Sequence, residues 1–187
     1  LDDLARNEIF EPLNMDNSSF NPPDRLNERI APTEKSSRRN TILRGEVHDE
    51  NCYALGGVSG HAGLFSTAGD LANFLSVLLN GGEFNGKRFI SAGSVRLFNR
   101  NFTSKLNENR GLGWKLQGEE TESAGDLLSK TSFGHTGFTG GSIWVDPLES
   151  LGIIILTNRV HPERSRGQDR INDFRARVNN VILGELT

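Results

Sequence analysis

The feature that most constrains this chain is a set of strand-like segments in its last third, most of them joined by only a few residues. The segments are residues 112–117, 131–135, 141–146 and 151–157, with a turn predicted at 146–149. Parallel strands need a crossover of a dozen or more residues, so short connections favour antiparallel pairing. The sequence therefore predicts an antiparallel sheet.

A last helix is predicted to follow these strands, from about Gln168 to Leu183. Its apolar residues recur at helical spacing and are expected to face one way: Ile171, Phe174, Val178, Val181 and Ile182. Helices come first in the chain, then the strands, then this helix. That order predicts an α+β fold with an antiparallel sheet flanked by helices, not a doubly wound nucleotide-binding fold.

Residues 1–110 are predicted to be mainly helix and loop, and residues 111–187 to hold the strands and the C-terminal helix. A chain of 187 residues suits one domain with a real core. Local signals in the first part are a helix over residues 1–10, a polar loop over 14–44, a Thr67-x-x-Asp70 capping box before an apolar helix, an Asn85-Gly86 hairpin, and a helix cap at Ser91.

Composition excludes several classes of function. Charged residues make up 24% of the chain and the net charge is −3, which argues against nucleic acid as a partner, because phosphate binding needs a basic excess. No apolar run reaches the ~18 residues of a membrane span. The single cysteine, Cys52, excludes an intrachain disulfide.

The candidate site lies in the stretch FGHTGFTGGSIWVDP, residues 133–147. Glycines at the end of a strand let a substrate approach the main chain closely. His135 can hold a substrate group or move a proton near neutral pH, and the Thr136 hydroxyl can donate to a carbonyl or carboxylate. A glycine-rich bulge with a surface histidine is the alternative.

This stretch resembles the Lys-Thr-Gly box of serine β-lactamases and penicillin-binding proteins, in a His-Thr-Gly variant close to the class C β-lactamase group. Residues 56–75, GGVSGHAGLFSTAGDLANFL, and residues 4–20, LARNEIFEPLNMDNSSF, are similar to other segments of that family, in the same order. The resemblance implies the C-terminal part of the β-lactamase/transpeptidase-like fold.

The resemblance also implies roles for individual residues. The Phe138 backbone N–H would belong to an oxyanion hole, together with the N–H of the nucleophile. His135 would be catalytic, and Thr136, Gly137 and Thr139 would contact the substrate. Neither a metal nor an organic cofactor is expected.

The family's nucleophile motif, Ser-x-x-Lys, does not occur in this sequence. The residues three positions before the five lysines are Pro32, Phe84, Phe102, Leu112 and Leu127. The only tyrosine, Tyr53, is not followed by the family's second motif. The chain is therefore expected to be the C-terminal portion of a single, incomplete domain and to be inactive alone. Its partner would be an N-terminal segment of the same protein that carries Ser-x-x-Lys.

A second group of polar residues surrounds the glycine-rich segment. His48, Gly60 and His61 are predicted to line the substrate pocket or to brace its loops. Ser59 as a nucleophile is a weaker alternative, because its surroundings fall short of Gly-x-Ser-x-Gly and follow no convincing strand. His48, Asp49, Glu50 and His61 do not have the spacing of a metal site.

The sequence favours a serine hydrolase that cleaves an amide or ester bond by acyl transfer, acting on a β-lactam, a D-amino peptide or an ester. Histidine in place of lysine removes a permanent cation, which favours peptides or esters over β-lactams that carry a carboxylate. The alternative is a non-catalytic module that binds peptidoglycan-like ligands. The resemblance implies a periplasmic or extracellular location.

Overall fold

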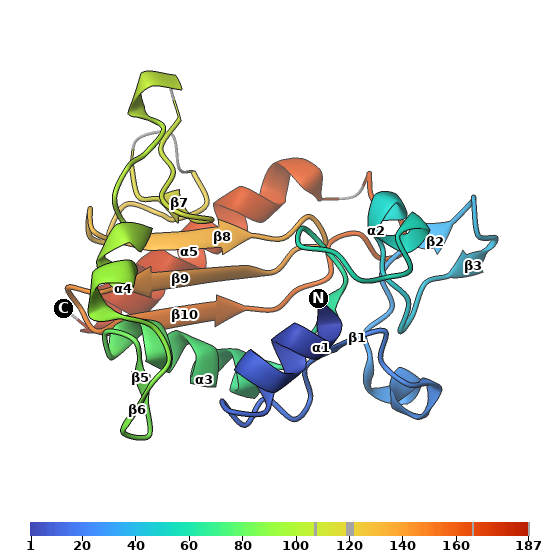
Figure 1. The fold of residues 1–187 in the computed structure, drawn as a ribbon. Coiled ribbons are helices and arrows are strands. Elements are labelled where there is room, and N and C mark those ends of the chain that lie inside the picture. The colour runs from blue at the N-terminus through green and yellow to red at the C-terminus, as the bar shows by residue number, and fades with distance from the viewer. Residues whose placement is uncertain (107, 119–121, 166, 187) are drawn as a thin grey trace. The chain divides into compact units, whose positions relative to one another are not determined.

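The computed structural model describes residues 1–106, 108–118, 122–165 and 167–186 (Figure 1). The chain divides into two compact units. The first comprises Leu1–Asn73 and Thr157–Gln168, and the second comprises Phe74–Leu156 and Asp169–Thr187.

The second unit is built on an antiparallel sheet with the strand order β10-β9-β8-β7. Its strands are β7 (Lys115–Leu116), β8 (Phe133–Thr136), β9 (Ser142–Asp146) and β10 (Leu151–Ile155). Each neighbouring pair is antiparallel, as the short connections predict. The predicted α+β class and antiparallel sheet are confirmed.

The first predicted strand is much shorter than expected. Only β7 remains of the segment 112–117, because the residues before it form a turn in which Gly111 N–H donates to the Trp114 carbonyl. Gly113 lies in the left-handed region, with φ of +77°, which turns the chain out of the extended conformation.

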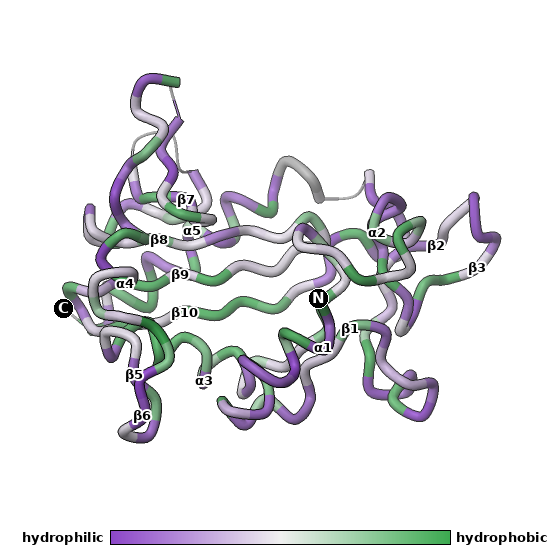
Figure 2. The backbone as a smooth tube through the Cα atoms, in the orientation of Figure 1, coloured by the Kyte–Doolittle hydropathy of each residue, from purple (hydrophilic) through white to green (hydrophobic). Residues whose placement is uncertain are grey.

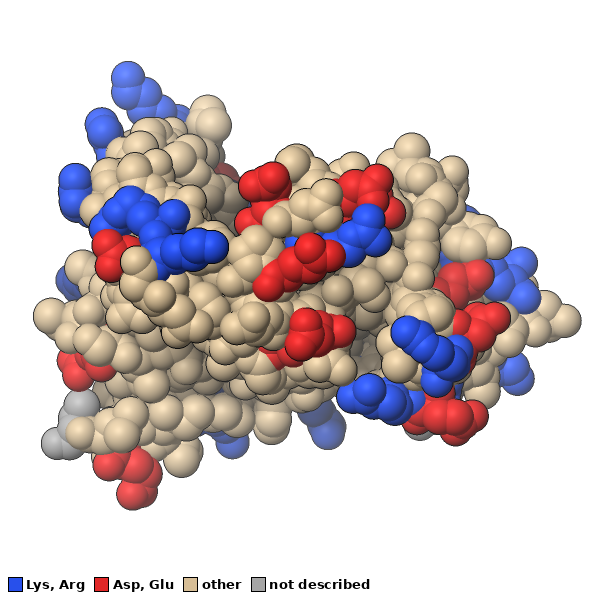
Figure 3. Space-filling model, turned by 60° about the horizontal axis from the view of Figure 1, so that its bottom comes forward, with Lys and Arg blue, Asp and Glu red and all other residues tan. Residues whose placement is uncertain are grey.

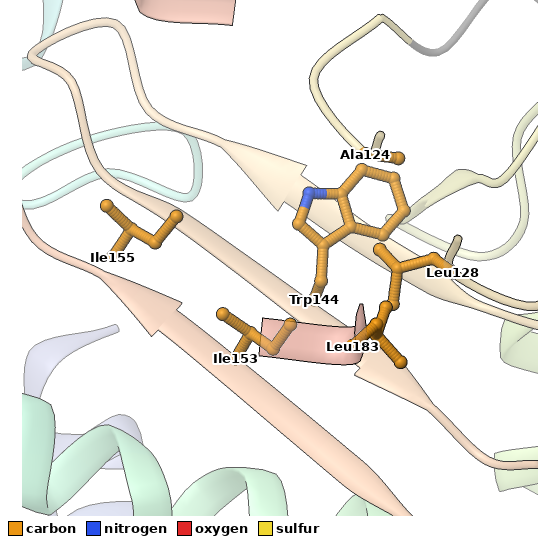
Figure 4. Close-up of a cluster of buried hydrophobic side chains, with 6 residues drawn as sticks. All are labelled: Ala124, Leu128, Trp144, Ile153, Ile155 and Leu183. Atoms are coloured by element: carbon orange, nitrogen blue, oxygen red, sulfur yellow. The ribbon is translucent and has the colours of Figure 1, made fainter. Parts of the chain in front are cut away.

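Helix α5 (Gln168–Leu186) packs on one face of the sheet through a cluster of buried apolar side chains (Figure 4). Trp144 is fully buried at its centre, and Leu183 reaches it from α5. The cluster consists of Ala124, Leu128, Trp144, Ile153, Ile155 and Leu183, with Val178 and Ile182 packed against it. The predicted packing of the last helix on one face of the sheet is confirmed.

The predicted apolar stripe of that helix is partly wrong. Phe174 and Val181 are 46% and 65% exposed, whereas Arg175 and Asn179 are buried. Those two polar residues stand one turn apart on the stripe that leads to Leu183. They can be buried because backbone carbonyls accept their hydrogen bonds: Asn179 Nδ2 donates to Ser123 and Ala124.

A second cluster lies on the other face of the sheet, since neighbouring residues of a strand, such as Trp144 and Val145, point to opposite faces. There Phe133 and Val145 pack against Leu75 and Leu78 of helix α3 (Ala68–Leu79). Figure 2 shows strand β10 in green, the colour of hydrophobic residues, along most of its length. Trp114 packs its ring on Phe133, with centroids 5.4 Å apart, which agrees with its interpretation as a core residue.

Local turn chemistry in this unit follows the sequence signals. Asn85 and Gly86 both have positive φ, as a type I′ turn requires, and they join β5 (Glu83–Phe84) to β6 (Lys87–Arg88). Ser91 Oγ accepts from Ser94 N–H and caps helix α4 (Ala92–Phe98). A 3₁₀ turn, η3 (Ser104–Leu106), follows that helix.

The first unit consists of short elements. A helix begins as α1 (Asp2–Ala5) and continues as the π-helical turn η1 (Arg6–Phe10). The segment 14–44, predicted as loop, contains short elements as well. In chain order these are β1 (Ser19–Phe20), the 3₁₀ segment η2 (Asp24–Arg29), β2 (Lys35–Ser36) and β3 (Thr41–Ile42). Helix α2 (Glu50–Ala54) follows, and β4 (Leu64–Phe65) pairs with β1.

Thr67 caps α3, as the sequence predicts, since Asp70 N–H donates to Thr67 Oγ1, and Thr67 Oγ1 in turn donates to the Asp70 carboxylate at 3.0 Å. The Asp70 carboxylate is buried and accepts from Ser18 Oγ and from Asn17 N–H, both at 2.8 Å. Burial alone would raise the pKa of this carboxyl, but these hydrogen bonds outweigh burial and lower it. Asp70 therefore ties the N-terminal segment to the start of the helix.

Candidate functional site

The predicted site in the second unit begins at the edge of the sheet. Strand β8 ends with His135 and Thr136, which pair with Ile143 and Ser142 of β9. On its other side, β7 pairs only with Phe133 and Gly134, so within the described residues no strand continues past His135 on that edge. A glycine-rich loop then leads back into β9.

Hydrogen bonds of its own hold this loop, residues 137–141, in a tight turn. Gly137 N–H donates to the Gly141 carbonyl at 2.8 Å, and Gly140 N–H donates to the Gly137 carbonyl at 3.1 Å. Gly140 has φ of +129°, a conformation that side chains rarely adopt. The Phe138 side chain is 55% exposed, and Thr139 is half-buried.

Arg175 of α5 binds three carbonyl oxygens of this loop. Its guanidinium donates to the carbonyls of Gly137 at 2.9 Å, Gly141 at 2.8 Å and Gly140 at 3.2 Å. The residue is only 3% exposed. Sequence reasoning missed it, because hydropathy assigns an arginine to the solvent side of a helix. The available signal was Arg175 and Asn179 one turn apart, in line with Leu183.

His135 has a defined tautomer. Its Nδ1 lies 2.9 Å from the Thr136 carbonyl oxygen, which can only accept, so Nδ1 carries the proton and Nε2 is left as an acceptor. Partial burial lowers the pKa of His135, and the positive charges of Lys115 and Arg110 lower it further. Together these effects outweigh the hydrogen bond to the Thr136 carbonyl, which alone would raise the pKa. The ring is therefore neutral near pH 7 and able to accept a proton.

In the first unit, the structure brings His61 together with Asp49 and Ser59. His61 Nε2 donates to the Asp49 carboxylate at 3.0 Å, which leaves Nδ1 to accept from Ser59 Oγ at 2.6 Å. Asp49 is also the N-cap of α2, and the Cys52 N–H, followed by the His61 hydrogen bond, lowers the pKa of Asp49. Gly60, between Ser59 and His61, is exposed.

This arrangement has the order of groups that activates a serine, but its surroundings differ from a nucleophile elbow. An elbow places the serine on a sharp turn after a strand. Here helix α2 and a turn at residues 55–57 precede Ser59. His61 N–H also lies 3.5 Å from Ser59 Oγ, so the same contacts brace the loop.

His48 lies in a different cluster and is buried. Its Nε2 donates to Glu34 at 2.7 Å, and Arg164 binds the same carboxylate through Nε at 2.9 Å and Nη2 at 2.7 Å. Arg164 also pairs with Glu50 at 2.6 Å. Arg164 first, and then His48, lowers the pKa of Glu34. These contacts match the loop-bracing interpretation of His48.

The candidate residues thus form three groups. His135, Thr136, Gly137, Phe138 and Thr139 share one strand end and its loop in the second unit. His61 and Gly60 lie beside Asp49, and His48 lies with Glu34, in the first unit. The described residues contain no cluster of three or more His, Cys, Asp or Glu side chains arranged to hold a metal ion.

A polar cavity of about 250 Å³ opens in the second unit and is lined by Glu108, Asn109, Arg110, Lys115, Glu122, Ser123 and Asn172. On the face drawn in Figure 3, basic and acidic side chains lie interspersed rather than in one basic surface. Among the helices that the structure describes, none is long and apolar enough to cross a membrane.

Comparison with known proteins gives a consistent relationship. Residues 1–177 match the family model described as Beta-lactamase. A protein of Escherichia coli K12, named "Putative D-alanyl-D-alanine carboxypeptidase", is 35% identical over 190 residues, which cover 93% of this chain and 43% of that protein. The chain thus spans less than half the length of this curated relative.

Solved structures show the same fold at lower identity. A β-lactamase from Mycobacterium bovis matches with a TM-score of 0.66 and 22% identity, covering 100% of this chain and 56% of that chain. A mutant of simvastatin synthase from Aspergillus terreus matches with a TM-score of 0.64 and 19% identity, covering 100% and 50%. The described architecture therefore corresponds to about half of that fold.

Proposed function

Because this chain belongs to the β-lactamase family, we propose that it is part of a serine hydrolase that cleaves an amide or ester bond by acyl-enzyme transfer. The observation that carries the proposal is the end of β8. There a neutral His135, with Nε2 as an acceptor, stands directly before the glycine-rich loop that presents the Phe138 peptide group.

The nucleophile in this proposal is a serine of a Ser-x-x-Lys segment of the same protein, outside the 187 residues, since this sequence contains no such motif. The lysine takes the hydroxyl proton as the serine oxygen attacks the carbonyl carbon. The carbonyl oxygen becomes an oxyanion, which accepts from the Phe138 N–H and from the N–H of the nucleophile. As the bond to the leaving group breaks, His135 Nε2 takes the proton held by the lysine ammonium and passes it to the leaving nitrogen or oxygen. Thr136 and Thr139 contact the substrate.

The proposed substrates are peptides that end in a D-amino acid, or simple esters. The name of the E. coli relative supports the peptide. A neutral histidine in place of a lysine offers no fixed cation to a substrate carboxylate, which favours esters over carboxylate-bearing β-lactams. A periplasmic or extracellular location, which the family resemblance implies, is part of the proposal.

A panel of three substrates tests this assignment in the protein that includes the Ser-x-x-Lys segment. We expect release of D-alanine from a D-alanyl-D-alanine peptide and release of nitrophenol from a short-chain nitrophenyl ester. Hydrolysis of a carboxylate-bearing cephalosporin should be at least ~100-fold less efficient in kcat/KM than ester cleavage, because no fixed cation meets its carboxylate. The peptide ends in a carboxylate as well, so release of D-alanine should also be slower than ester cleavage. Efficient cephalosporin hydrolysis, with neither of the other two reactions, would contradict the assignment.

The role of His135 is tested by H135A in the same protein. Loss of a proton-transfer group should lower kcat/KM by roughly 100-fold. In the wild type the neutral ring is the active form, so kcat/KM should fall on acidification, with an apparent pKa below about 6.5. This acidic limb should be absent from the residual activity of H135A.

His161 offers a matched control, because it is also an exposed histidine whose Nδ1 lies near a carbonyl, that of Thr33. H161A should keep the wild-type rate and the same pH profile. An unchanged rate in H135A, or an equal loss in H161A, would remove His135 from the proposed mechanism.

A second candidate function is a binding module that does not turn its ligand over. Absence of Ser-x-x-Lys from the whole protein would favour it. Calorimetry with a D-alanyl-D-alanine peptide would then show binding to the 187-residue chain with no release of D-alanine. The same binding followed by turnover in a protein with the Ser-x-x-Lys segment would favour the enzyme.

A further inference from the structure

Arg175 is a buried cation whose hydrogen bonds converge on one short loop. It reaches the carbonyls of Gly137, Gly140 and Gly141 from a helix more than 30 positions later in the chain. Its Nη1 also donates to Asn172 Oδ1 at 3.1 Å, one turn earlier on α5. At 3% exposure, the guanidinium is held by protein groups rather than by solvent.

The geometry of the peptide bond links this contact to the next residue. A trans peptide group is planar, and its C=O and N–H point in opposite directions. The Gly137 carbonyl belongs to the same peptide group as the Phe138 N–H. Because that carbonyl points at Arg175 Nη2, the Phe138 N–H must point away from Arg175, on the other side of the loop.

The charge of Arg175 acts on the same peptide group. A cation that binds a carbonyl oxygen polarises the amide and makes its N–H a stronger donor, and this cooperative effect is larger where water is excluded. The planar guanidinium fork fits several acceptors at once, whereas a lysine ammonium is a point charge with different directions of donation. Both the direction and the donor strength of the Phe138 N–H therefore depend on Arg175.

We propose that Arg175 is a positioning residue that orients and strengthens the Phe138 N–H as an oxyanion donor. In this role Arg175 does not contact the reacting atoms, and it acts through the Gly137–Phe138 peptide group and the loop carbonyls that it binds. The inference rests on the proposed function for its catalytic consequence. Its structural part, the hydrogen bond from Arg175 to the Gly137 carbonyl beside that from the Gly140 N–H, does not depend on that function.

The kinetic test compares R175K and R175M with the wild type in the protein that carries Ser-x-x-Lys. Removal of an oxyanion donor lowers kcat by about 100-fold or more, so R175M should approach about 100-fold, with KM changed less than about twofold. R175K keeps the positive charge but not the planar guanidinium, so its kcat should lie between those of R175M and the wild type. A boronate analogue of the tetrahedral intermediate should lose affinity by the same factor as kcat/KM.

Arg177 provides the matched control on the same helix. Its side chain is 77% exposed and pairs with Asp173 at 2.9 Å. R177M should leave kcat and the affinity of the boronate within about twofold of wild type. If Arg175 contributed only to stability, R175M would lower the melting temperature but would not lower kcat selectively with KM nearly unchanged.

A second measurement uses the 187-residue chain itself and needs no activity. In the amide NMR spectrum, R175K should shift the Phe138 resonance upfield and speed hydrogen exchange in residues 137–141, with little change elsewhere. If the longer wild-type protein forms no acyl-enzyme, the proposed function fails, and this spectrum still decides the inference. An unchanged Phe138 amide in R175K, or an unchanged kcat in folded R175M, would overturn it.

Discussion

The 187-residue chain is expected to stay unlabelled by a fluorophosphonate, whereas the same chain joined to its Ser-x-x-Lys segment should be labelled at one serine. The reason is that loss of nucleophile and base leaves only binding and oxyanion stabilisation, which costs several orders of magnitude in rate. Intact-mass spectrometry measures the outcome directly as one added phosphonyl group per molecule. Peptide mapping then identifies the modified residue.

Ser59 is the residue that makes this experiment discriminating. Its Oγ lies 2.6 Å from His61 Nδ1, and Asp49 holds the other side of that ring at 3.0 Å. S59A in the joined protein should therefore be labelled as fast as the wild type. Stoichiometric labelling of the isolated chain at Ser59 would contradict our assignment and place the reactive serine in the first unit.

Replacement of Gly134 by alanine is expected to destabilise the protein by about 3 kcal/mol, near the upper end for overpacking of a core. A Cβ at this position would stand 2.3 Å from the Ile143 carbonyl oxygen and 2.5 Å from the Trp144 ring. Trp144 is fully buried, so the ring has no room to move away. Equilibrium unfolding in urea measures the loss as a lower midpoint at unchanged slope.

Gly137→Ala is the matched control for this substitution, three residues further along the same segment. Its Cβ would meet its nearest neighbour, the Gly141 carbonyl oxygen, at 3.7 Å, which is ordinary van der Waals contact. We expect a loss of less than about 1 kcal/mol. Equal losses in the two variants would show that close packing against Trp144 does not explain the glycine at position 134.

Much of the fold could be predicted because its signals are local. Short connections dictated the antiparallel order of β8, β9 and β10. The Asn85-Gly86 turn and the Ser91 cap depend on residues within three positions of one another, and both are present. The sequence signals failed at β7, where the positive φ of Gly113 keeps the residues before Lys115 out of the strand. They failed also on α5, where Phe174 and Val181 are exposed.

Part of the candidate site could be predicted from the sequence and part could not. Glycines around His135 marked the end of β8 from the sequence, and the family resemblance is confirmed by the match over residues 1–177. The tautomer of His135 and the burial of His48 beside Glu34 were not predictable, since each depends on which carbonyl or carboxylate lies within about 3 Å.

The sequence by itself determined the α+β class, the antiparallel sheet, the helix caps and the family. It did so because periodicity, turn residues and motifs act over a few neighbouring positions. Only the tertiary structure decided which polar groups are buried together: Arg175 with the carbonyl of Gly137, 38 positions away, and Arg164 with Glu34, 130 positions away. A buried polar side chain is stable only where the fold places hydrogen-bond partners beside it, and a hydropathy pattern does not show where those partners will lie.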